Sequence, residues 1–183
     1  LFLDVTGTGG SGKSILAEIA TLLAGEDNAT SATIETLESP RERAALIGFP
    51  LIRLPDQDKW SGDGAGLKAI TGGDAVSVDP KYRDAYSAYI PAVILAVNNN
   101  PMRFTNRSGG VSRRRVIIHF PEQIAPEERD PQLRDKIARE LAVIVRQLMQ
   151  RFRDPMTART LLQSQQNSDE ALSIKRDADP TFD

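Results

Sequence analysis

Gly7-Thr8-Gly9-Gly10-Ser11-Gly12-Lys13-Ser14 is the stretch that decides the fold of this chain. It follows the apolar run Leu1–Thr6 and precedes residues 15–23, whose apolar positions recur at helical spacing. The order of strand, glycine-rich loop and helix, with the spacing G-x-x-x-x-G-K-[ST], is typical of a phosphate-binding P-loop. A flexible Gly/Ser linker would not lie between an apolar strand and such a helix. We therefore expect a nucleotide-binding α/β fold.

The chemistry of the loop assigns a role to each of its residue types. Glycines let backbone N–H groups turn inward onto phosphate oxygens, and the positive end of the following helix adds to the attraction for anions. Lys13 is expected to reach the β- and γ-phosphates, and Ser14 to offer its hydroxyl to Mg²⁺. The predicted nucleotide-binding residues are Gly7, Gly9, Gly10, Ser11, Gly12, Lys13 and Ser14.

The composition of the 183-residue chain limits its possible functions. The formal net charge is −2, so any contact with nucleic acid must come from a local cluster of cations. The chain has no Cys and one His, which excludes Cys-rich zinc sites, Cys–His nucleophiles and disulfide scaffolds and suits a reducing cytoplasm. No apolar run reaches the length of a membrane span, and because the chain opens without an initiator Met we expect a fragment of a longer protein.

An apolar strand that ends in an acid is the second element that a P-loop fold requires, and residues 49–56 supply it. Asp56 is expected to hold Mg²⁺ beside the phosphates, with an ordinary turn residue as the alternative. The next residue is Gln57, which can orient a water molecule but cannot take its proton. The assignment of the general base therefore stays open, with Asp58 or a more distant acid as alternatives.

A hairpin with a cationic tip is predicted in the middle of the chain. Residues 75–79 alternate as a strand does, and Pro80-Lys81-Tyr82-Arg83 then forms a turn with two cations and an aromatic ring. Such a tip suits a grip on the backbone and bases of single-stranded DNA, with Lys81, Tyr82 and Arg83 as contacts. The alternative is an ordinary solvated hairpin.

Two further segments carry candidate catalytic side chains. Residues 89–97 are nearly all apolar, as in a doubly covered parallel strand, and run into Asn98, which either binds a γ-phosphate or its attacking water or forms a turn. The run Arg113, Arg114 and Arg115 enters a β-branched strand that ends at Phe120. This run either supplies an arginine finger, often across a subunit boundary, or forms a solvated edge. His119 in this strand is expected to be structural.

Caps and periodicity predict five more elements: a strand at 31–36 and helices at 39–46, 63–69, 125–152 and 156–175. Ser39 is the expected N-cap of the first of these helices, and Asp154-Pro155 separates the last two. The chain is therefore divided into a core at residues 1–124 and a C-terminal helical extension of the same domain at residues 125–183.

In this order the motifs resemble the helicase domain of superfamily-three viral and phage helicases. They look closest to the primase–helicase replication proteins of satellite phages, plasmids and poxviruses. The resemblance covers residues 1 to about 120 and depends on four features, with the arginine run as a fifth. The four are the P-loop, the acidic strand end at Asp56, the stretch Gly66–Asp74, and the buried strand that ends in Asn98 with Pro101 close behind.

The resemblance implies an AAA+-like P-loop NTPase that hydrolyses ATP with Mg²⁺ at the subunit interfaces of a hexameric ring and moves on single-stranded or forked DNA. It implies that Lys13 and Ser14 belong to the nucleotide loop, that Asp56 binds the metal and that Asn98 senses the phosphate. One residue of the arginine run, Arg114 by preference, matches the finger that reaches the neighbour's ATP. Residues 76–83 match the pore hairpin, with Lys81 as the DNA contact.

Two other functions stay open at this point. A non-translocating ATPase switch, such as a loader or an initiator, would bind duplex DNA and only remodel it. A small-molecule kinase would act as a monomer and would give no role to the arginine run or to the long helical tail. Strand displacement stimulated by single-stranded DNA would separate a helicase from a switch.

Overall fold

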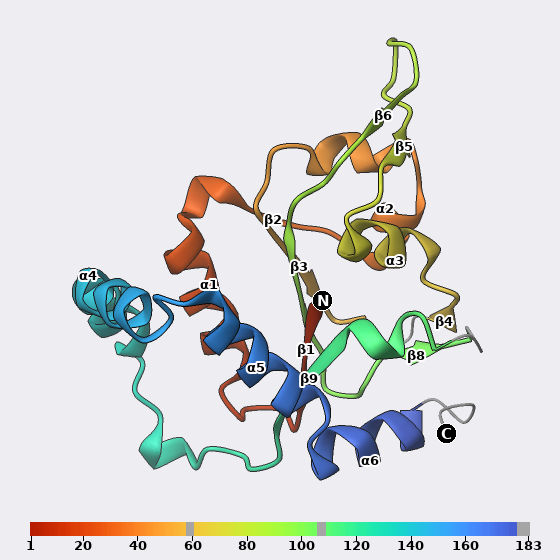
Figure 1. Cartoon of the computed structure of the whole chain (residues 1–183). Coiled ribbons are helices and arrows are strands. Elements are labelled where there is room, and N and C mark those ends of the chain that lie inside the picture. The colour runs from red at the N-terminus through yellow and green to blue at the C-terminus, as the bar shows by residue number, and fades with distance from the viewer. Residues whose placement is uncertain (58–60, 106–108, 179–183) are drawn as a thin grey trace.

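The centre of the fold is a parallel five-stranded sheet, seen nearly edge-on in Figure 1. The computed structural model describes residues 1–57, 61–105 and 109–178. The strand order is β2-β3-β7-β1-β9, and every pair is parallel. Its strands are β1 (Phe2–Gly7), β2 (Ala29–Ser31), β3 (Leu51–Pro55), β7 (Val93–Val97) and β9 (Arg115–Phe120).

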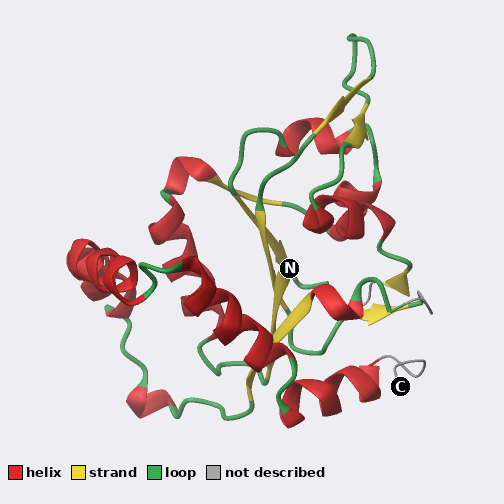
Figure 2. Cartoon of the chain, viewed as in Figure 1, coloured by secondary structure: helices red, strands yellow, loops and turns green. Residues whose placement is uncertain are grey.

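Helices flank this sheet on both sides, as Figure 2 shows, which confirms the predicted α/β class with a central parallel sheet. The α-helices are α1 (Lys13–Ala24), α2 (Ile34–Glu38), α3 (Ala65–Gly72), α4 (Leu133–Arg151), α5 (Pro155–Gln166) and α6 (Asp169–Ala178). The 3₁₀ helices are η1 (Glu26–Asn28), η2 (Glu42–Leu46), η3 (Ser112–Arg114) and η4 (Pro126–Glu128). Two short pairs lie outside the main sheet: β4 (Ser61–Gly62) with β8 (Arg103–Phe104), and β5 (Val76–Val78) with β6 (Tyr86–Ala88).

Alternate residues of β1 point to opposite faces of the sheet and enter two separate hydrophobic clusters. Phe2 belongs to the larger cluster, which is completed by α2, by α3 and by Met102, Phe104 and Val111. Val5 belongs to the smaller cluster, which packs under α1 through Ala17. Apolar side chains on both faces are typical of a central strand buried under two helical layers, and the buried Asp4 and Thr6 are the polar exceptions in β1.

Parallel pairing brings the carboxyl ends of the strands to one edge of the sheet. Residue Val5 of β1 pairs with Val97 of β7, and Gly7 pairs with Phe120 of β9. The segments that follow β1, β3 and β7 therefore meet at this edge, where ligands bind in open α/β sheets.

The region between β1 and β3 differs from the prediction. Residues 31–36 are not a strand: β2 ends at Ser31, and Thr33 caps the short helix α2 by accepting a hydrogen bond from Thr36 N at 3.4 Å. Ser39 follows α2 instead of starting an α-helix, although its Oγ does accept from Glu42 N at 3.4 Å, at the start of η2. Here the local capping signal outweighs the β-branched composition.

The C-terminal extension begins later and is divided once more than predicted. Residues 126–128 form η4, and the long helix α4 starts at Leu133. Asp154 caps α5 as expected, but that helix stops at Gln166, and Ser168 starts α6 by accepting from Ala171 N at 3.2 Å. The extension packs α4 against α1, and α5 and α6 against the edge strand β9. Within the described ranges, no helix is both long enough and apolar enough to cross a bilayer.

Candidate nucleotide-binding site

The predicted P-loop connects the end of β1 to the start of α1 at the carboxyl edge of the sheet. Gly7 has a φ of 136°, and a Cβ at this position would lie 2.0 Å from the carbonyl oxygen of Phe120. Only glycine fits so close to the neighbouring strand. The loop is fixed there by hydrogen bonds from Gly7 N to Asn99 O and from Thr8 N to Phe120 O, both at 3.3 Å.

The ammonium group of Lys13 lies inside this loop. Its Nζ donates to Gly7 O at 2.9 Å, to Thr8 O at 2.5 Å and to Ser11 Oγ at 3.4 Å, and the residue is only 7% exposed. Ser14, in the first turn of α1, is exposed. The loop therefore presents a fixed positive charge and the N-terminus of the 12-residue helix α1 at the carboxyl edge of the sheet, an arrangement suited to phosphate oxygens.

Asp56 lies at the same edge, directly after β3. Its N–H donates to Val97 O at 3.1 Å, which places it one strand away from β1. The side chain is exposed, and the backbone has a left-handed φ of 54°. Such a conformation in a residue other than glycine is enriched at functional sites. A carboxylate and the Ser14 hydroxyl are oxygen ligands of the kind that Mg²⁺ prefers.

Gln57 turns inward instead of facing the site. Its Oε1 accepts from Ile34 N at 2.9 Å, its Nε2 donates to Pro55 O at 2.5 Å, and the residue is 6% exposed. These bonds make Gln57 a structural link between the end of β3 and the start of α2, so it is not placed to orient a water molecule. Asp58, the other candidate base, lies outside the described residues.

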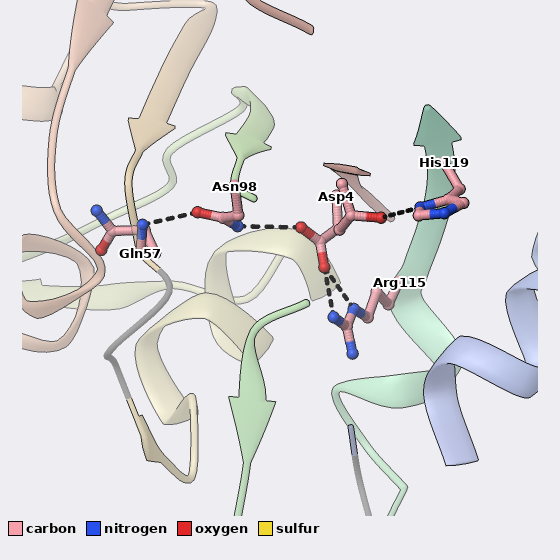
Figure 3. A network of polar contacts seen from close by, with 6 residues as sticks. Asp4, Gln57, Asn98, Arg115 and His119 are labelled. Atoms are coloured by element: carbon pink, nitrogen blue, oxygen red, sulfur yellow. Dashed lines mark hydrogen bonds and ion pairs between the residues drawn. The ribbon is translucent and has the colours of Figure 1, made fainter. Parts of the chain in front are cut away.

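Asn98 belongs to a buried network that was not predicted (Figure 3). Its Oδ1 accepts from Gln57 N at 2.6 Å, and its Nδ2 donates to Asp4 Oδ1 at 3.2 Å. Asp4 in turn accepts from Arg115 Nε at 2.8 Å and Nη2 at 2.5 Å. Asn98 is 1% exposed with both side-chain polar atoms bonded, so the expected phosphate-sensor role is corrected to a positioning role. The next residue, Asn99, is exposed, and its carbonyl accepts from Gly7 N of the loop.

The three arginines of the run have three different environments. Arg115 is 1% exposed and forms the buried ion pair with Asp4, so it cannot reach a neighbouring subunit and is corrected from a finger candidate to a structural residue. Arg114 is half-buried and donates to Gly110 O at 2.7 Å, whereas Arg113 is exposed. The predicted structural role of His119 fits its contact with Thr6 Oγ1 at 3.0 Å.

The arginine run and the P-loop lie at opposite edges of the sheet. Arg115 pairs with Phe2 at the start of β1, and Phe120 pairs with Gly7 at its end. Five residue steps along the strand separate these two pairs, or about 16 Å at about 3.3 Å per step. Arg113 and Arg114 therefore cannot complete the P-loop site of their own chain.

The predicted hairpin is present and extends away from the body of the molecule (Figure 1). Its tip carries Lys81, Tyr82 and Arg83, all exposed; Tyr82 is 89% exposed, and Lys81 Nζ lies 4.7 Å from its ring centroid. Arg41, which sequence reasoning missed, lines the same concave surface beside Lys81. The hairpin leads into the start of β7, so it leaves the sheet at the edge opposite the P-loop.

Arg129 is a second residue that sequence reasoning missed: it fell within the helix expected at residues 125–152 and was given no role. Its guanidinium lies against the P-loop: a Cβ at Gly10 would be 2.9 Å from Arg129 Nη2. No local pattern could have shown this contact, because it joins segments that are more than 100 residues apart.

Comparison with known proteins agrees with this fold. The chain is similar to a solved structure described as "The A form apo structure of NrS-1 C terminal region-CTR", with a TM-score of 0.57 and 14% sequence identity. The match covers 76% of this chain but only 34% of that one, so this chain spans about a third of the length of the larger structure. A protein family described as "Family of unknown function (DUF5906)" matches residues 5–115, which include the second half of β1 and the glycine-rich loop and reach the first residue of β9. By this match over more than half of its length, the chain belongs to the family DUF5906.

Proposed function

We propose that this chain is a P-loop ATPase domain of the AAA+-like class that acts as a replicative DNA helicase within a hexameric ring. The observation that carries the proposal is the P-loop itself, with the Lys13 ammonium 2.9 Å and 2.5 Å from two loop carbonyls. An incoming triphosphate would exchange these neutral acceptors for phosphate oxygens, which bind an ammonium more strongly.

The proposed roles follow from the placement of side chains at the carboxyl edge. Loop N–H groups and Lys13 bind the β- and γ-phosphates, and the exposed residue Asn99 adjoins the loop through its carbonyl. Ser14 and Asp56 would hold Mg²⁺, whose charge offsets the negative charge of the phosphates. The buried Asn98 holds the loop after β3 in place through Gln57 N at 2.6 Å and thereby positions Asp56.

The assignment of a ring is supported by the separation of the arginines from the P-loop. Because Arg113 and Arg114 lie at the opposite edge of the sheet, a guanidinium from this run can act only on the nucleotide of another subunit. The exposed hairpin tip, with Lys81, Tyr82 and Arg83, supports contact with single-stranded DNA, where rings stack on bases and cations follow the backbone.

ATP hydrolysis and strand displacement by the purified chain, each with and without single-stranded DNA, test this proposal. We expect DNA-stimulated hydrolysis that Lys13→Ala abolishes and that Arg139→Ala, a change of an exposed cation on α4, leaves unchanged. Hydrolysis without strand displacement would favour a non-translocating switch that remodels duplex DNA. An absence of ATP binding by the wild-type chain would refute the proposal.

A further inference from the structure

A cavity of about 640 Å³ lies beside the P-loop, and the loop forms only part of its lining. One wall is formed by residues 10–15, the second half of the loop and the first turn of α1, and the other by residues 124–133 of the C-terminal extension. A volume of this size falls within the range of about 300–1,000 Å³ that is usual for small-molecule sites. The cavity adjoins the place where the triphosphate is proposed to bind.

The segment that closes the cavity is bonded directly to the loop. Ile124 N donates to Gly10 O at 3.1 Å, and Arg129 Nε donates to Ile124 O at 3.1 Å. Gly10 has a φ of 77°, and a Cβ there would lie 2.9 Å from Arg129 Nη2 and 3.3 Å from Gln123 Nε2. Glycine at this position thus allows the guanidinium to lie against the phosphate loop.

The charge of Arg129 is available to a ligand. Among the residues that the structure describes, no carboxylate forms an ion pair with it. Asp130, which also lines the cavity, accepts instead from Lys136 Nζ at 2.5 Å and from Gln132 N at 2.9 Å. A guanidinium beside a P-loop, without a carboxylate partner, is suited to a phosphate group.

The rest of the lining is mainly apolar. Ile15, Ile124, Pro131 and Leu133 provide walls against which a flat aromatic base can pack. Glu128, at the same cavity, offers acceptors for a ribose hydroxyl or an amino group. An apolar cavity with a few converging polar groups is the usual form of a nucleoside site.

Building on the nucleotide site proposed above, we propose that residues 124–133 complete it within the same chain. Arg129 binds the phosphates of a nucleoside di- or triphosphate, and the apolar wall with Leu133 binds its base. The C-terminal extension is then part of the nucleotide site, and Arg129 is a cation supplied in cis, distinct from the arginines at the opposite edge of the sheet.

Isothermal titration of the full chain with two probes, ATP and inorganic triphosphate, tests the two halves of this proposal separately. Arg129→Ala should weaken the binding of both probes by about tenfold, the loss of one charge-assisted contact, and Arg129→Lys should restore part of it. Leu133→Ala should weaken ATP binding by roughly threefold to tenfold and leave inorganic triphosphate unchanged, because only ATP has a base to pack. Arg139→Ala is the matched control on the exposed face of α4 and should change neither.

Different results would overturn the role of residues 124–133 and the proposed binding of ATP by the P-loop, on which that role depends. Unchanged ATP binding by Arg129→Ala, with binding abolished by Lys13→Ala, would overturn the role of Arg129 and leave the P-loop assignment intact. Equal affinities of the wild-type chain for ATP and inorganic triphosphate would overturn the base site. A wild-type chain that binds neither probe would overturn both proposals.

Discussion

Arg115→Met should destabilise the fold severely, although the residue belongs to an arginine run that looks solvent-exposed in the sequence. Arg115 is 1% exposed and Asp4 is fully buried, with two hydrogen bonds of 2.8 and 2.5 Å between them. Without the guanidinium, Asp4 would retain, among the described residues, only the side-chain bond from Asn98 Nδ2 at 3.2 Å. Leaving one charge of a buried pair without its partner costs about 3–5 kcal/mol.

Urea unfolding followed by far-UV circular dichroism measures this cost. If the free energy of unfolding falls by about 2 kcal/mol per molar urea, the urea concentration at the midpoint of unfolding should be roughly 1.5–2.5 M lower for Arg115→Met than for the wild-type chain. Arg114→Met is the matched control, because its half-buried guanidinium donates to Gly110 O and, among the described residues, forms no ion pair with a carboxylate. Its midpoint should change by less than about 0.5 M.

A double variant separates the ion pair from simple packing. Asp4→Leu combined with Arg115→Met removes both charges and should be more stable than Arg115→Met alone, because no charge is left buried. If Arg115→Met shifted the midpoint no more than Arg114→Met does, the structural role assigned to Arg115 would be wrong. A double variant less stable than Arg115→Met would show that the loss comes from packing and not from the charge of Asp4.

Three further predictions concern the proposed ring, the hairpin and a buried lysine. Mixing Lys13→Ala subunits with Arg114→Ala subunits should restore part of the ATPase rate that each lacks alone, and no recovery in mixed rings would count against a finger supplied in trans. Tyr82→Ala should weaken single-stranded DNA binding by about 1–3 kcal/mol in a fluorescence titration. Lys81→Ala should lower the slope of the logarithm of the binding constant against the logarithm of the salt concentration by about 0.7. An unchanged affinity and an unchanged slope would remove the hairpin from the DNA site. Burial, with a smaller contribution from Arg115, lowers the pKa of Lys175 from 10.5 to about 8, so between these values the unfolded chain binds the proton that the folded chain has released. The free energy of unfolding should therefore rise with pH across this window. The urea midpoint of the wild-type chain should show this rise, and the midpoint of Lys175→Met should not. A rise of the same size in the wild-type chain and in Lys175→Met would assign it to other groups.

Features that local sequence encodes were predicted correctly. The strand, glycine loop and helix at residues 1–24 follow from glycines and apolar periodicity within a short window, and the hairpin after residue 75 follows from alternation around a turn. The helix cap at Asp154 followed from its own side chain and the proline after it. Where local signals compete, as at residues 31–39, the element type was wrong, because β-branched composition is only a weak preference that a capping side chain can override.

Tertiary structure alone decided which polar residues meet. The sequence by itself determined that a P-loop motif, an acid and an arginine run exist. It contains no signal that tells which of Arg113, Arg114 and Arg115 is buried. Strand pairing places Arg115, the first residue of β9, against Asp4, 111 positions earlier in the chain, whereas Arg113 lies in η3 before the strand and is exposed. The same long-range packing buried Asn98 and brought Arg129 to the glycine loop. Side-chain direction alternates along a strand and partners come from distant segments, so these roles depend on chain topology and not on local composition.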